Sequence, residues 1–430
     1  MPTRNILAAA VFAVAASVCA AGAAFAQPAP SPAPTAKPAP SAAPAAASPA
    51  PATSGSPAPS PTPTPYKLIT ISGSADGGFT SIEGADSARF VTGTPSRVFD
   101  ASTGPFFDAN GGRQLAPAND FSHALDLQNA NIQVNFNGPF IGGKIEESFG
   151  TDADVIASNG QSRSGNNLTQ AYLQAARGPV TLLAGKFSSL AGAEVIEAPG
   201  NSNYSRSYLF GYAVPFTHTG VRLTYVVNPK ASIVVGANNG WDDWKFAGKK
   251  KTFEGALLLT PSPAFALTLD TYNGNDFAVG GNSTLGFLPI YTNRTLYDGV
   301  LTVHATSALT LIANYDNGSQ LGDGTGAFDT ARWNGIAGYL NYAFTPVYGI
   351  SLRKETFHDP EGFRTSLAQR VQSNTATFNY SPGTNFIFRL EYRLDTSDLN
   401  AFSYRGFDAT TGIGRPHQSS LGVETIVKFP

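Results

Sequence analysis

Charged residues alternate with large apolar residues near the C-terminal end of the chain. Arg389, Glu391 and Arg393 occupy every second position, and apolar side chains fill the positions between them. Successive side chains of a β-strand point to opposite faces, so the three charged groups would share one face. Fixed charges beside water attract or repel ions, because low-dielectric walls focus the field. The spacing therefore predicts a charged wall along an aqueous path.

The same spacing recurs in earlier segments. The residues that it assigns to the water-facing side of strands, as candidate pore-lining groups, are Lys144, Glu146, Arg222, Arg353, Glu355, Arg389, Glu391 and Arg393. One hypothesis is that Arg353, Arg389 and Arg393 form a basic ladder that filters ions. The alternative is that these charges form cross-strand ion pairs that only keep the interior wet. The sequence leaves both open.

Other residue types that carry chemistry are scattered. The five histidines stand singly, without metal-ligand spacing, and Cys19 is the only cysteine. A Ser–His hydrolase would need a pair such as Ser232 and His218 in register on adjacent strands, and nothing in the pattern places them so. Asp242 and Asp243 offer carboxylates to Ca²⁺, but such a pair is more often a solvated loop end. The sequence therefore predicts no enzyme and no resident metal or cofactor.

The N-terminus predicts export. Met1–Ala26 contains a positive residue, a short apolar region and a small-x-small cleavage site, which are the parts of a signal peptide. The alternative is an uncleaved anchor helix, which the short apolar region disfavours. The Pro- and Ala-rich tract 27–65 cannot build a core, so we expect an extended linker. The linker would either tether the protein to periplasmic peptidoglycan or form a disordered tail.

The composition of residues 66–430 is typical of a transmembrane β-barrel. Charged residues make up 13% of the whole chain, about half the usual share for soluble domains. No run after the signal peptide is long and apolar enough for a transmembrane helix. Barrel strands need only one apolar side, because the other side meets water. Removal of Arg4 with the signal changes the formal net charge from −2 to −3, so no basic character indicates nucleic acid.

Tight turns divide this region into hairpins. Seven of them separate runs of alternating side chains, and they lie at Asn137–Pro139, Arg177–Pro179, Asn228–Lys230, Pro261–Pro263, Thr306–Ser307, Thr345–Pro346 and Ser381–Gly383. Gly, Pro, Asn and Ser have the backbone preferences that such turns require. Longer polar segments lead from one hairpin to the next, and the strands are long enough to cross a bilayer when tilted.

Seven hairpins, a first strand near Tyr66 and a last strand at the C-terminus predict an antiparallel up-and-down β-barrel of about sixteen strands. An even number places both termini on the periplasmic side. Fourteen or eighteen strands are alternatives, because the loop from Gly73 to Phe121 could hide another hairpin. A secreted soluble β protein is the alternative class. Sixteen strands would leave an aqueous lumen, whereas eight would be filled by side chains.

Three segments resemble the OmpL-like β-barrel porin family. They are Asn203–Phe210 (NYSRSYLF), Pro215–Val221 (PFTHTGV) and Asn239–Asp242 (NGWD). The resemblance implies an outer-membrane channel whose solute is undefined, and it supplies no catalytic residues. The last strand, which ends at Phe429, also resembles the C-terminal signal that outer-membrane barrels offer to their assembly machinery, although Pro430 follows the aromatic residue.

By the same resemblance, the third long loop, residues 188–215, would fold into the barrel as a constriction. Glu194 and Glu197 would then provide acidic groups opposite the basic wall. The alternative is a surface loop. Lys249–Lys251 could contact lipopolysaccharide phosphates or form a charged loop base. Aromatic residues such as Tyr342 and Tyr348 suit the membrane interface.

The predicted function is an outer-membrane porin: a water-filled channel for passive diffusion of small hydrophilic solutes or ions. A homotrimer is expected by analogy with other sixteen-stranded porins. The alternative is a non-conducting structural or adhesive barrel, in which the long loop 73–121 would plug the lumen or be displayed.

Overall fold

The computed structural model describes residues 68–82, 91–92, 117–118, 124–158, 161, 165–245, 250–283, 286–322, 329–365, 367–399, 401–403 and 414–429. The predicted signal peptide (Met1–Ala26), the linker 27–65 and most of the loop 73–121 lie outside the described residues, as does Lys249.

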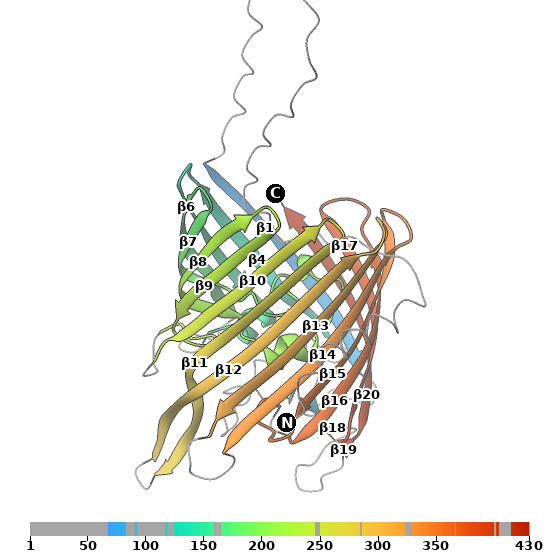
Figure 1. The fold of residues 1–430 in the computed structure, drawn as a ribbon. Helices are drawn as coiled ribbons and strands as arrows, with labels where there is room; N and C mark the ends of the chain where they lie inside the picture. Colours follow the sequence, from blue (N-terminus) through green and yellow to red (C-terminus); the bar gives the residue numbers. More distant parts are fainter. Residues whose placement is uncertain are drawn as a thin grey trace, which may run out of the picture.

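The described chain forms a closed barrel of sixteen antiparallel strands (Figure 1), which confirms the predicted fold class. In chain order, these strands are β1 (Ile69–Ile82), β4 (Ala124–Asn137), β5 (Ile141–Phe149), β6 (Asn166–Arg177), β7 (Val180–Ser188), β8 (Thr217–Asn228), β9 (Ala231–Asn238), β10 (Thr252–Ser262), β11 (Phe265–Ser283), β12 (Gly286–His304), β13 (Leu309–Leu321), β14 (Thr330–Ala343), β15 (Tyr348–Asp359), β16 (Gln369–Tyr380), β17 (Phe386–Ser397) and β20 (His417–Phe429). Each strand pairs with its neighbours in sequence, and β1 closes the ring against β20.

All seven predicted tight turns connect consecutive barrel strands at one end of the barrel, called here the tight-turn end. One is displaced slightly, because β10 continues through Ser262 and the turn falls at Pro263–Ala264. The opposite end carries the longer connections and is called the long-loop end (Figure 1).

The predicted start of the first long loop at Gly73 is wrong. Strand β1 continues to Ile82, because the Gly-rich stretch Gly73–Gly78 forms backbone ladders with both β4 and β20. Small residues carry no apolar alternation, so the sequence gives no strand pattern in this stretch. Two short strands, β2 (Val91–Thr92) and β3 (Pro117–Ala118), form a separate two-stranded sheet, as do β18 (Phe402–Ser403) and β19 (Gly414–Arg415).

Successive side chains of the wall alternate between an exposed outer face and a buried inner face. In β20, Leu421, Val427 and Phe429 are exposed on the outer face, whereas Glu424 and Ile426 are buried on the inner face. A wall with apolar groups outside and charged groups inside is the pattern of a barrel that meets lipid outside and water within. Among the described residues, no helix has both the length and the apolar character needed to span a bilayer.

Residues 189–216, between β7 and β8, lie inside the barrel and are called here the inner segment. They include a 3₁₀ turn, η1 (Ala198–Gly200), and a short π-helix, η2 (Leu209–Ala213), which contacts β13 and β14. Most buried apolar residues of this segment, from Ala191 to Phe216, belong to one cluster with inward-facing side chains of the wall. The apolar core of the protein is therefore enclosed by the barrel.

Candidate functional site

The inner segment is held against the opposite wall by carboxylates that accept its backbone amides. Glu391 of β17 accepts hydrogen bonds from the amides of Tyr204 (2.8 Å) and Ser205 (3.0 Å). Glu355 of β15 accepts one from the amide of Tyr208 (2.6 Å). Hydrogen bonds to charged acceptors are stronger than neutral ones, so these contacts fix the path of the segment across the lumen.

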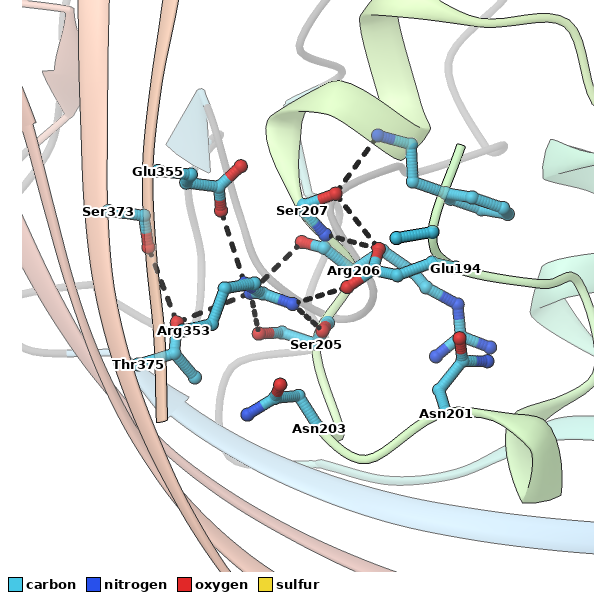
Figure 2. Close-up of polar contacts among 12 residues, drawn as sticks. Glu194, Asn201, Asn203, Ser205, Arg206, Ser207, Arg353, Glu355, Ser373 and Thr375 are labelled. Carbon is cyan, nitrogen blue, oxygen red and sulfur yellow. Dashed lines mark hydrogen bonds and ion pairs between the residues drawn. The ribbon is translucent and has the colours of Figure 1, made fainter. Parts of the chain in front are cut away.

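Arg353 of β15 joins the wall to the inner segment (Figure 2). Its guanidinium lies 2.8 Å from a carboxylate oxygen of Glu194 and 3.3 Å from one of Glu355. It also donates to the carbonyl oxygen of Ser205 (2.6 Å). The side chain is almost fully buried, so its charge depends on these partners for stabilisation. Glu194 in turn accepts hydrogen bonds from the amide and hydroxyl of Ser207.

Two arginines of β17 make equivalent contacts. Arg389 pairs with Glu424 of β20 at 2.7 Å and donates to the carbonyl oxygens of Ala198 and Asn201. Arg393 pairs with Asp395 at 2.7 Å, donates to the carbonyl oxygen of Arg206 at 2.7 Å and lies over the ring of Tyr208.

The three arginines of the proposed basic ladder thus share one wall, and each is ion-paired. Two further predicted wall cations are also paired, at 2.6 Å in each case: Lys144 with Glu146, and Arg222 with Glu254 of β10. Ion pairs were the alternative to an unpaired basic ladder in the sequence analysis, and the structure has such pairs. Whether these groups filter ions remains a prediction.

Glu197 of the inner segment lies beside Glu146 and Lys144 of β5. Burial and the neighbouring carboxylate of Glu146 raise the pKa of Glu197 to about 7, although Lys144 opposes this shift. Glu194 and Glu197, which the sequence grouped together, therefore contact different walls. Glu194 contacts a basic group, whereas Glu197 contacts an acid and its lysine partner.

A row of three aspartates was missed by the sequence analysis. Asp270 of β11 lies directly opposite Asp298 of β12, which lies directly opposite Asp316 of β13. All three are buried on the inner face, and none forms an ion pair with the described residues. Neither carboxylate oxygen of Asp270 accepts a hydrogen bond there. Each aspartate follows the period-two alternation of its strand, so the pattern could have revealed the row.

The amide of Ala193, at the start of the inner segment, donates to Asn314 beside this row at 3.1 Å. The side chain of Asn314 donates to Asp298 at 2.6 Å. The inner segment is therefore anchored at both walls: by hydrogen bonds next to an acidic row at one end, and by arginines at the other.

Aromatic side chains pack around η2 toward the long-loop end. Trp333 of β14 donates its indole N–H to the carbonyl of Ala213 (3.1 Å) and meets Trp241 edge to face. The guanidinium of Arg364 lies over the rings of both tryptophans. These contacts narrow that half of the lumen.

The weaker sequence candidates take structural roles. Asp242, proposed as a Ca²⁺ ligand, accepts the amides of Phe216 and Thr217, each at 2.8 Å. His218 stacks on Tyr272 and does not face Ser232, which lies opposite Val226 in the ladder. Within the ranges that the structure describes, no group of three or more His, Cys, Asp or Glu side chains is arranged to hold a metal ion.

Comparison with known proteins agrees with this architecture. The family model described as "Putative beta-barrel porin-2, OmpL-like" matches residues 69–429. A search of curated proteins found no match.

Several solved outer-membrane structures share the fold. The outer membrane channel DcaP of Acinetobacter baumannii aligns with a TM-score of 0.54 at 14% identity, covering 84% of this chain and 97% of that one. The anion-selective porin from Comamonas acidovorans aligns with a TM-score of 0.56 at 11% identity, covering 84% and 99%. OmpT of Vibrio cholerae gives 0.53 at 9% identity, covering 84% and 97%. At these identities the likeness concerns the fold alone.

The double variant Arg389→Ala, Arg393→Ala tests the arginine wall. It leaves Glu424 and Asp395 without their cations and frees three carbonyls of the inner segment. We expect the potassium-to-chloride permeability ratio in planar bilayers to shift toward potassium, with noisier open-channel current. Arg177→Ala, at an exposed tight turn, is the control. An unchanged ratio in the double variant would remove both arginines from the filter.

Glu197→Gln tests the acidic contact with Glu146. Because the pKa of Glu197 is raised from 4.5 to about 7, the folded state keeps a proton that the unfolded chain has lost in that range. Stability contributed by this group is therefore lost as pH rises from about 4.5 to about 7. As pH rises across this window, the free energy of unfolding of the wild type in urea should fall relative to that of Glu197→Gln. A constant difference between the two proteins would contradict the contact.

Asp270→Asn tests the acidic row. Like charges directly opposite each other destabilise a strand pair, and the amide keeps the shape of the side chain. We expect the free energy of unfolding in urea at pH 8 to increase by about 1 kcal/mol. Asp395→Asn, which removes the partner of Arg393, is the matched control and should destabilise. A loss of stability in Asp270→Asn would mean that its charge is compensated.

Proposed function

The chain belongs to the OmpL-like β-barrel porin family, and we propose that its inner segment forms the constriction of a water-filled channel for small hydrophilic solutes or ions. The outer membrane is the location that family membership implies. The observation that carries the proposal is the charge-lined inner segment, which crosses the lumen of a sixteen-stranded barrel. A barrel of this size leaves a lumen unless something fills it.

Solvent exposure along the inner wall supports this location of the constriction. Polar inward-facing residues toward the tight-turn end are only half-buried; examples are Gln133, Asn135, Gln174, Thr224 and Thr302. Arg353, Glu355 and the acidic row, which lie beside the inner segment, are almost completely buried. A wet vestibule that narrows at the inner segment accounts for both observations.

A non-conducting structural barrel is the second candidate. The observation in its favour is the cluster of Trp241, Trp333, Phe357, Phe363 and η2, all buried inside the barrel. Such packing closes a lumen unless solutes pass beside it. Conductance separates the two candidates directly.

The surroundings of the barrel follow from its proposed orientation. We place the tight-turn end and both termini in the periplasm, after export by the signal peptide Met1–Ala26. The linker 27–65 would then reach peptidoglycan, and β20 would present the C-terminal signal to the assembly machinery. A homotrimer is the proposed oligomer.

Deletion of Ala193–Ala198 tests the constriction. The deletion removes Glu194, the partner of Arg353, and shortens the inner segment at its narrow crossing. We expect larger single-channel conductance steps in planar bilayers and faster liposome swelling with sugars. Heat-modifiable migration on gels controls for folding. Unchanged step size would show that the constriction lies elsewhere, and silence of the folded wild type would favour the structural barrel.

A further inference from the structure

The outer face of the barrel carries a basic cluster at the long-loop end. It comprises Arg332 of β14, Lys354 and His358 of β15, and Arg370 of β16, and is called here the outer basic cluster. Arg332, Lys354 and Arg370 are exposed, and His358 is half-buried. His358 and Arg370 lie directly opposite each other in the ladder, so the cations of three adjacent strands share one patch.

These cations are not neutralised as those of the lumen are. Within the part of the chain that the structure describes, none of the four forms an ion pair. Two acids beside the cluster, Glu361 and Asp398, accept the backbone amides of Arg332 and Arg370, each at 2.8 Å. Both carboxylates therefore bond to the backbone of the cluster, and within the described residues neither forms an ion pair with its side chains.

An aromatic group at the other end of the same strands indicates the height of the outer basic cluster relative to the membrane. Tyr348 stacks on Tyr380 with ring centroids 5.2 Å apart, and Tyr342 lies one strand away. Lys354 lies six residues from Tyr348. Ten residues separate Tyr342 from Arg332, Tyr348 from His358 and Tyr380 from Arg370. At about 3.3 Å per residue and a tilt of about 40°, that separation is about 25 Å, the height of the apolar band of an outer-membrane barrel.

Apolar side chains cover the half of this surface next to the tyrosines, and polar residues, Thr356, Gln372 and Asn374, cover the half next to the cluster. Ile350 and Leu352 of β15 face outward, flanked by Leu340 of β14 and Ala376 of β16. Lys354 lies above Leu352, and a long lysine side chain can lift its ammonium group toward the headgroup level. The surface therefore matches an amphiphile with acyl chains below and an anionic headgroup above.

We propose that the outer basic cluster binds the phosphate groups of the phosphorylated glycolipid in the outer leaflet. Guanidinium groups bind phosphate in a bidentate manner, and two arginines with a lysine offer several donors to one headgroup. The proposal rests on the orientation under Proposed function, which places the long-loop end outside the cell. The site is separate from Lys250 and Lys251, and the latter donates to Asn239 at 2.7 Å.

Native mass spectrometry of the purified full-length protein in detergent, titrated with diphosphoryl lipid A, tests the proposal. The triple variant Arg332→Gln, Lys354→Gln, Arg370→Gln removes the charges and keeps polar side chains of similar length. We expect its affinity for diphosphoryl lipid A to fall about tenfold or more, because each cation near an anionic lipid surface contributes to binding. Monophosphoryl lipid A should bind the wild type more weakly than the diphosphoryl form.

The matched control is Arg177→Gln, Lys230→Gln, which removes two exposed cations from the tight-turn end and should retain wild-type binding. Unchanged affinity of the triple variant overturns the proposal. So does equal binding of phosphatidylglycerol by the wild type, which would indicate a general anionic surface. Bilayer conductance is recorded separately: a silent wild type that still binds lipid A through the cluster would refute the channel and not the lipid site.

Discussion

Closure of the backbone hydrogen-bond ring is the constraint on which the rest of this structure depends. A chain that crosses hydrocarbon cannot leave amide and carbonyl groups unpaired, and a strand at a sheet edge leaves a whole row of them. Here β1 supplies the closing strand, because one edge pairs with β4 and the other with β20. Its small residues allow that double pairing even though they contribute little apolar surface.

Once the ring is closed, polar groups of the inner segment must find partners inside it. The wall meets this requirement with charged side chains: Glu355 and Glu391 accept amides, while Arg353, Arg389 and Arg393 donate to carbonyls. The same arginines are paired with acids, so nearly buried charges are compensated within the lumen. Among the described residues, Asp270, Asp298 and Asp316 have no cation as a partner, and the contrast gives the lumen an uneven distribution of charge.

The wall was predictable from sequence because local rules determine it. Turn residues such as Asn228 and Pro346 mark the hairpins, and period-two alternation assigns Arg353 and Glu355 to the inner face. The path of the inner segment was not predictable, because Glu194 meets Arg353 only after the ring closes. The sequence predicted too early an end for β1 for a different reason. Gly73 and Gly78 carry no side-chain signal, and their strand conformation comes from pairing with two neighbouring strands.

The contacts of the inner segment join residues far apart in the chain: the amide of Tyr204 bonds to Glu391, 187 residues later. The ends of the segment bond to Asp242 and Tyr272, but the side chains that hold its middle, Arg353, Glu355 and Glu391, all lie in the last third of the polypeptide. The middle of the segment therefore finds its partners only when β15 and β17 are in place, and its docking closes a long loop at a cost in chain entropy. A barrel without β15 and β17 would leave the backbone amides of Tyr204, Ser205 and Tyr208 without their carboxylate acceptors, so the central crossing of the lumen is a property of the finished ring alone.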